Sequence, residues 1–193
     1  MMQDFRLFAL ITAGPKSVAV PANTLSIHKL LDIQPVGVYT ALRTFQHNKF
    51  LLLNQHLRRL EESMARLGWE YELDQQGLRK ALHLVCSSYP LADSRIRIDV
   101  LSRPSADFGF DARVFIAQGP HIALSESVYS EGVHVGIARH LKRLDPKVKS
   151  AEFVIKRRAF LNKRSDLFEA LLVDDQGYIL EGTSSNFFAI LGG

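Results

Sequence analysis

The chain has 193 residues, of which 47% are hydrophobic and 23% charged, a balance typical of a soluble globular protein with one or two packed domains. The formal net charge is +4, but no run of five like charges occurs, which argues against a nucleic-acid partner. No stretch approaches the roughly 18 consecutive apolar residues that a membrane span needs, so we expect no membrane partner.

The only cysteine is Cys86, which excludes an internal disulfide framework and a thiolate metal cluster. It lies within an apolar helical pattern, so we expect a buried structural thiol and no metal site. A lone thiol fits a reducing, cytoplasmic compartment. The segment 1–14 has an acid beside its first apolar run and no basic stretch, which favours a strand over a signal peptide.

Several short segments predict β-strands. Three of them are apolar runs, and Gln46, His47 and Asn48 separate two of these runs as in a hairpin. A fourth segment alternates polar and apolar residues, which predicts a half-buried strand with two arginines and an acid on its open face. The predicted strands are 5–12, 39–45, 49–53, 95–100 and 113–118.

Two stretches predict amphipathic helices, because their apolar residues recur at spacings of three and four. The first begins near Gln55, and Gly68 supplies its C-terminal stop. The second has Asp74 as a candidate N-cap and ends before Pro90. The apolar stripes are Leu57, Leu60, Met64 and Leu67 in the first helix, and Leu78, Leu82 and Val85 in the second.

A change of composition near residue 120 predicts a domain boundary. We assign an N-terminal α/β domain to 1–119, a linker to 120–132 and the start of a second domain to 133–193. The gapped order of strands and helices indicates the α+β class. The predicted elements of the second domain are a strand at 133–138, a helix at 150–162, a strand at 170–173, a turn at 175–177 and strands through 178–190.

Four features could carry chemistry, although each has an ordinary structural explanation. They are Arg58 with Arg59, the arginines of the alternating strand, the segment 147–149 and the polar segment 181–186. A helical arginine usually forms a surface ion pair. A lysine is usually solvated unless burial or a nearby cation changes its pKa. A run of small polar residues is usually a turn.

Taken together and in order, these features resemble the class IV (fold type IV) pyridoxal-phosphate-dependent aminotransferases. That family includes branched-chain and D-amino-acid aminotransferases and aminodeoxychorismate lyase. The last of the matching segments is the most specific one. The segments are GVYTALRTF at 37–45, HLRRL at 56–60, KSAEF at 149–153, EALL at 169–172 and EGTSSNFF at 181–188.

The resemblance implies an enzyme with a two-domain fold, in which a small N-terminal α/β domain precedes a cofactor-binding C-terminal domain. It also implies pyridoxal 5'-phosphate as cofactor, amino acids and 2-oxo acids as substrates, and a homodimer. Members of the family continue for about another third of their length. We therefore expect that the C-terminal third is missing here and that the second domain is incomplete.

Carried over by residue, the resemblance makes Lys149 the catalytic lysine, which forms the Schiff base with the cofactor and moves the substrate's α proton. Glu181 matches the acid that faces the pyridine nitrogen, and Arg59 matches a phosphate ligand. Ser185 and Asn186 match further cofactor-binding positions. Lys147 is the rival for the catalytic role, and spacing alone does not exclude it.

Tyr39, Arg43 and Arg97 match strand positions that face the substrate in the family, where an arginine could bind a carboxylate. These assignments depend on register, because a slip of one residue would turn each side chain to the other face of the sheet. The expected residues therefore rest on the alignment of two strands.

The leading hypothesis is amino-group transfer through a lysine Schiff base. Signals of subtype conflict: Tyr39 resembles the D-amino-acid aminotransferases and Thr40 the lyases, while Val154 stands where branched-chain enzymes usually have tyrosine. One alternative is an aminodeoxychorismate lyase that releases pyruvate and 4-aminobenzoate. Another is a truncated, non-catalytic member that acts as a dimerisation or binding module.

Overall fold

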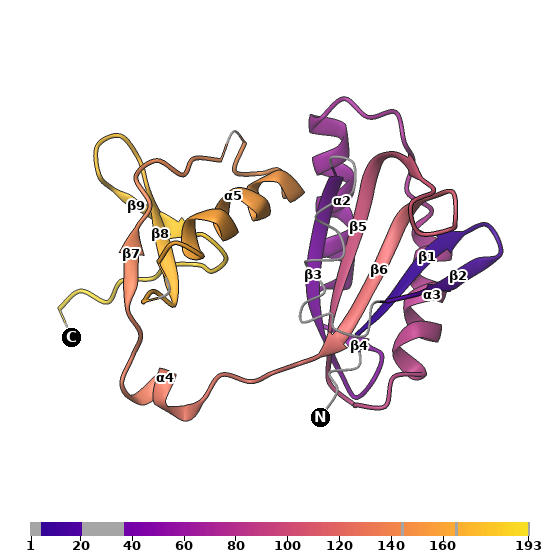
Figure 1. Cartoon of the computed structure of the whole chain (residues 1–193), viewed down its shortest axis with the longest axis horizontal. Helices are drawn as coiled ribbons and strands as arrows, with labels where there is room; N and C mark the ends of the chain where they lie inside the picture. Colours follow the sequence, from indigo (N-terminus) through magenta and orange to yellow (C-terminus); the bar gives the residue numbers. More distant parts are fainter. Residues whose placement is uncertain (1–4, 21–36, 144, 165, 193) are drawn as a thin grey trace. The chain divides into compact units, whose positions relative to one another are not determined.

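The computed structural model describes residues 5–20, 37–143, 145–164 and 166–192, which fold as two compact units (Figure 1). One unit contains the described residues up to Ile122 together with the segment Lys147–Ala151. The other contains Ala123–Pro146 and the described residues from Glu152 onward. Within the described ranges, no helix is long and apolar enough to cross a membrane.

The first unit is built on a six-stranded antiparallel sheet with the order β2-β1-β6-β5-β3-β4. The predicted strands and the hairpin after residue 45 are confirmed, whereas the edge strand β2 was not predicted. The strands are β1 (Arg6–Ile11), β2 (Gly14–Val18), β3 (Gly37–Phe45), β4 (Lys49–Phe50), β5 (Ser94–Ser105) and β6 (Ala112–Pro120).

Both predicted helices are present, as α2 (Leu53–Arg66) and α3 (Gln75–Ser87). Helix α2 begins earlier than expected, so β4 keeps only two residues of the predicted strand 49–53. Its C-terminus is a Schellman turn: Gly68 adopts a φ of 71°, its N–H donates to Ala65 O at 3.0 Å, and Trp69 N donates to Met64 O at 3.1 Å. The N-cap of α3 is confirmed, because Asp74 Oδ1 accepts from Gly77 N at 2.8 Å.

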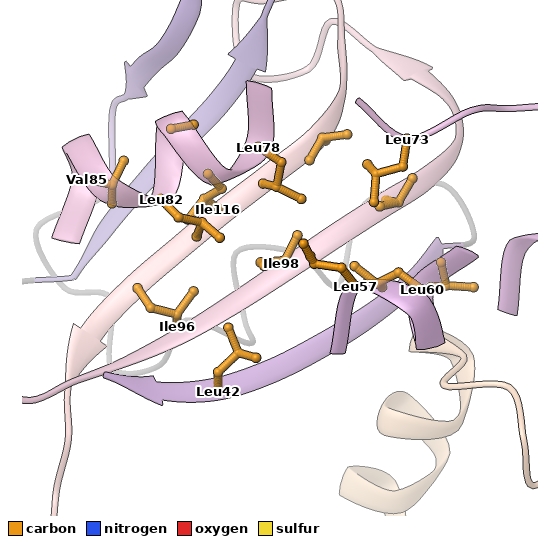
Figure 2. Close-up of a cluster of buried hydrophobic side chains, with 14 of the residues drawn as sticks. Leu42, Leu57, Leu60, Leu73, Leu78, Leu82, Val85, Ile96, Ile98 and Ile116 are labelled. Atoms are coloured by element: carbon orange, nitrogen blue, oxygen red, sulfur yellow. The ribbon is translucent and has the colours of Figure 1, made fainter. Parts of the chain in front are cut away.

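The main core lies between these helices and one face of the sheet (Figure 2). The apolar stripes of the two helices supply most of the layer that packs on the sheet. Alternate residues of β3, β5 and β6 supply the facing layer. The prediction for Leu67 is wrong, since it is 42% exposed at the turn that ends α2. The labelled core residues are Leu42, Leu57, Leu60, Leu73, Leu78, Leu82, Val85, Ile96, Ile98 and Ile116.

The opposite face of β5 differs from the prediction, because the strand is buried on both faces rather than half-buried. Arg97 and Asp99 are only 3% and 2% exposed. They neutralise each other in a bidentate pair, which allows both charges to leave water. Next to them the face is apolar, with Leu101 and Phe115 in a second buried cluster.

The second unit holds a three-stranded sheet, in which β8 pairs in parallel with β7 and antiparallel with β9. The predicted linker is not free of structure, since it contains the short helix α4. The prediction of strands through 178–190 is wrong beyond Gly182, where the described chain turns away from the sheet. The elements are α4 (Glu126–Ser130), β7 (Val135–Ile137), α5 (Ala151–Leu161), β8 (Glu169–Val173) and β9 (Ile179–Gly182).

The burial of Cys86 gives a direct test of the first unit's core. Its side chain is fully buried in that core, and burial raises the pKa of the thiol to about 12. We therefore expect no reaction with a thiol reagent at pH 8 in the native protein and complete reaction in denaturant, because the thiolate is the reactive form. Rapid labelling of the native protein would contradict this packing.

Candidate functional site

Lys149 lies against strand β3 within the first unit. Its carbonyl accepts a hydrogen bond from Tyr39 N at 3.1 Å, and Ser150 forms a bridge with Val38. Val148 is buried in the main core and anchors the segment there. Lys149 Nζ lies 5.4 Å from the centroid of the Tyr39 ring, close enough for a cation–π contact. The predicted catalytic lysine thus has a fixed backbone and an aromatic neighbour.

The rival Lys147 has a different environment. Its residue is exposed, whereas Lys149 is half-buried. Lys149 is the better candidate for a reactive lysine, because its backbone is held against β3 and its amine lies beside the Tyr39 ring. The structure therefore supports Lys149 over Lys147, and its catalytic role stays a prediction.

His56 of α2 lies within electrostatic reach of both Lys149 and Arg59. Burial lowers the pKa of the imidazole, and the positive charges of Lys149 and Arg59 lower it further. Its Nδ1 lies 2.7 Å from Thr40 Oγ1. Arg59 stands three residues after His56, where a helix places side chains on the same side, and it is exposed. The sequence analysis did not single out His56, although it stands in the HLRRL segment.

Tyr39 and Arg97 lie together, as their predicted roles require. The Arg97 guanidinium lies 4.4 Å from the Tyr39 ring centroid. Its Nε donates to Asp99 Oδ2 at 2.8 Å and its Nη2 donates to Asp99 Oδ1 at 2.5 Å. Arg97 therefore already holds a carboxylate, that of Asp99, which the sequence analysis did not assign. The signal was present, because residues two apart on a strand share a face.

Arg43 has exposed partners near the end of β3. It forms an ion pair with Asp93, and its guanidinium lies 4.7 Å from the ring centroid of Phe45. The hydrogen bond from Arg43 lowers the pKa of the Asp93 carboxyl. These contacts occupy Arg43 at the protein surface, so its role toward a substrate stays a prediction.

Glu181 belongs to the second unit, on strand β9. Its carboxylate lies 3.1 Å from Nε of Arg143, and its side chain is 32% exposed. The guanidinium of Arg143 also lies 4.4 Å from the ring centroid of Phe153. An open cavity of about 620 Å³ in this unit is lined by Glu181, Arg143 and Asn186, among others. The predicted acid thus pairs with a largely buried cation and borders a cavity that Asn186 also lines.

Ser185 contacts a buried acid that the sequence analysis quoted only as part of a motif. Its Oγ donates to Glu169 Oε2 at 3.1 Å. A Cβ at Gly182 would lie 2.2 Å from Ser185 Oγ, so a larger residue at this position would force the Ser185 side chain to move. The structure therefore brings the predicted residues together in two groups, one in each unit. The first group is Tyr39, Arg59, Arg97 and Lys149, and the second is Glu181, Ser185 and Asn186.

Comparison with known proteins gives consistent results. Residues 37–193 match the family model described as amino-transferase class IV. The chain is 27% identical over 165 residues to the "Putative branched-chain-amino-acid aminotransferase" of Methanocaldococcus jannaschii, covering 81% of this chain and 57% of that protein. The chain therefore spans less than two thirds of the length of this curated relative.

Solved structures show the same fold. A "Putative 4-amino-4-deoxychorismate lyase" aligns with a TM-score of 0.61 at 25% identity, over 90% of this chain and 65% of that one. "A hypothetical aminotransferase from Mycobacterium tuberculosis, PLP-bound form" aligns with a TM-score of 0.65 at 20% identity, over 93% and 66% of the two chains. The second likeness supports the fold alone.

Proposed function

Since this chain belongs to the class IV amino-transferase family, whose enzymes depend on pyridoxal phosphate, we propose that its protein transfers an amino group between an amino acid and a 2-oxo acid, with Lys149 as the catalytic lysine. The observation that carries the proposal is the setting of Lys149, which is half-buried against the Tyr39 ring, with His56 in electrostatic reach of both Lys149 and Arg59. This is a cationic site with one primary amine held in place.

The chemistry of the available groups fits the cofactor. Its aldehyde requires a primary amine, which Lys149 offers, and its phosphate requires cationic donors, which Arg59 offers as a planar fork. Its pyridine nitrogen requires a carboxylate, which Glu181 offers. When bound, pyridoxal phosphate supplies an electron sink for the negative charge that develops on the substrate's α carbon.

The residues of this chain then have distinct tasks. Lys149 Nζ is the base that takes the substrate's α proton and later returns a proton, a role that requires an amine able to exist unprotonated near neutral pH. Tyr39 packs beside this amine and limits its range of positions. Glu181, which pairs with Arg143, is proposed to keep the ring nitrogen protonated.

Arg59→Ala is expected to weaken cofactor binding. One charge-assisted contact to a phosphate contributes about 1.5–3 kcal/mol, which corresponds to roughly a 10- to 150-fold higher Kd for pyridoxal phosphate. Arg58→Ala is the matched control, because Arg58 is exposed and pairs with Glu62 at 3.5 Å on the helix surface. Titration followed by visible absorbance measures both variants. Equal losses in the two would remove Arg59 from the phosphate site.

A second candidate function is elimination of pyruvate from aminodeoxychorismate. The observation that favours it is the likeness to the 4-amino-4-deoxychorismate lyase structure at 25% identity over 90% of this chain. The curated relative favours amino-group transfer instead. The two reactions differ in product: a transaminase forms a new amino acid from a 2-oxo acid, whereas the lyase releases 4-aminobenzoate.

The deciding experiment combines covalent trapping with a product assay. Borohydride reduction of the full chain with pyridoxal phosphate fixes the cofactor on the lysine to which it is joined, and peptide mapping then identifies that lysine. We expect label on Lys149. Label on Lys147 or Lys156 would overturn the assignment, and a colourless protein that takes up no cofactor would indicate the non-catalytic module. Formation of 4-aminobenzoate would select the lyase.

A further inference from the structure

Glu169 is a buried acid to which the proposed function gives no task. It is the first residue of β8 and is only 6% exposed. Its carboxylate accepts hydrogen bonds from Ala170 N at 2.8 Å, Ser184 N at 3.0 Å, Ser184 Oγ at 2.5 Å and Ser185 Oγ at 3.1 Å, and also from Thr183 Oγ1. All but one of these donors lie in the turn that follows Glu181.

The pattern of donors requires a carboxylate and excludes an amide. Oε1 accepts from the backbone N–H of Ala170, and Oε2 accepts from the backbone N–H of Ser184. A hydroxyl can rotate, but a backbone N–H cannot become an acceptor. An amide nitrogen at either position would therefore place two donors face to face. Burial alone would raise the pKa of Glu169, but the hydrogen bonds from Ser184 and Thr183 hold it below its ordinary value.

A continuous set of contacts joins Glu169 to Glu181. Thr183 is held at its hydroxyl by Glu169 and at its N–H by Ala170 O, at 2.8 Å. The carbonyl of Thr183 accepts a hydrogen bond from Nη2 of Arg143 at 3.3 Å. Nε of the same guanidinium lies 3.1 Å from the Glu181 carboxylate. Thr183 thus contacts both the buried acid and the cation that pairs with Glu181.

We infer that Glu169 is a positioning residue, which acts through Thr183 and Arg143 to hold the Glu181 carboxylate in its working orientation. The inference rests on the proposed function, because it assumes that Glu181 serves the cofactor. Without the carboxylate at position 169, the donors of residues 183–185 lose the acceptor that they share. Arg143 and Glu181 then keep their charges but lose their fixed geometry.

The first arm of the test needs no cofactor. Glu169→Gln in the full chain should speed amide hydrogen exchange of Thr183 and Ser184 by about tenfold or more, since a buried bond to a charged acceptor is lost. Glu126→Gln is the control, because it makes the same change of charge at an exposed site in the same unit. Exchange at the wild-type rate in Glu169→Gln would overturn the inference.

The second arm separates positioning from a general loss of fold. Glu169→Gln should lower kcat by about tenfold or more with a smaller change of KM, and the double variant with Glu181→Gln should be no slower than Glu181→Gln alone. Independent, additive losses would overturn the inference. If Glu169→Gln does not fold, Thr183→Val replaces it in the same double-variant comparison with Glu181→Gln. This substitution removes the hydroxyl that donates to Glu169 and keeps the size of the side chain. Additive losses of kcat for Thr183→Val and Glu181→Gln would overturn the inference as well.

Failure of the proposed function has a different signature. In that case the wild-type chain itself shows no visible absorbance with pyridoxal phosphate and no label on Lys149. Failure of the inference leaves the wild-type absorbance and label intact, while Glu169→Gln matches the Glu126→Gln control.

Discussion

Lys149→Ala is expected to reduce turnover by roughly 10²- to 10⁴-fold, the range for loss of a positioned general base, and to abolish covalent trapping of the cofactor. The reason is that Lys149 supplies the amine beside the Tyr39 ring, which the variant lacks. Steady-state kinetics and peptide mapping after borohydride reduction measure the two effects.

Lys147→Ala is the matched control for Lys149→Ala. Lys147 is two residues away and exposed, so its removal should leave turnover and trapping near the wild-type level. Thermal unfolding checks that both variants retain the fold, since Val148 between them anchors the segment in the core. A variant of Lys149 that still turns over at the wild-type rate would remove this residue from the mechanism.

Glu181→Gln is expected to retain cofactor binding and to lose most of its turnover. A neutral amide cannot keep the ring nitrogen protonated, so the electron sink is lost while the contacts of Lys149 and Arg59 remain. Removing one preorganised electrostatic partner lowers kcat by about 10²- to 10³-fold in comparable sites. Absorbance titration gives the affinity, and initial rates give kcat.

Because Glu181 forms an ion pair with Arg143, the control for Glu181→Gln removes another acid that forms an ion pair. Glu152→Gln removes an acid that pairs with Lys156 on the surface at 2.7 Å, and its effect on turnover should be small. If Glu181→Gln weakens cofactor affinity and leaves kcat unchanged, Glu181 is only a structural partner of Arg143. Its assignment to the ring nitrogen would then be abandoned.

Local patterns in the sequence predicted most of the first unit's elements. Helices α2 and α3 follow from apolar spacing, and their ends follow from Gly68 and Asp74, because these signals act over a few residues. The strand at 14–18 was missed, since Gly14 and Pro15 are poor strand residues that are tolerated at a sheet edge. Beyond Gly182 the described chain forms no strand, and Ser184 N there donates a long-range hydrogen bond to Glu169 instead.

The candidate site was predictable only in part, for the same reason. Lys149, Arg59 and Glu181 were found through a family resemblance, and local physics alone had given each an ordinary explanation. The environment of His56 depends on contacts between elements distant in the chain, since Thr40 and Lys149 lie far from it in sequence. Such contacts leave no periodic signal in a single sequence, so the residues that hold the site in place were not identified.

The attachment of Lys147–Ala151 to the first unit has a consequence for the order of assembly during synthesis. The described strands β1 to β6 and helices α2 and α3 of that unit have all been synthesised once the ribosome has passed Pro120. The contact of Tyr39 with Lys149 forms only after α4 and β7 have been synthesised, because both precede Lys149 in the chain. Domains fold as units in the order in which they emerge, and closing a long loop is slow. The sheet therefore forms first, and the segment that contains Lys149 packs against it afterwards.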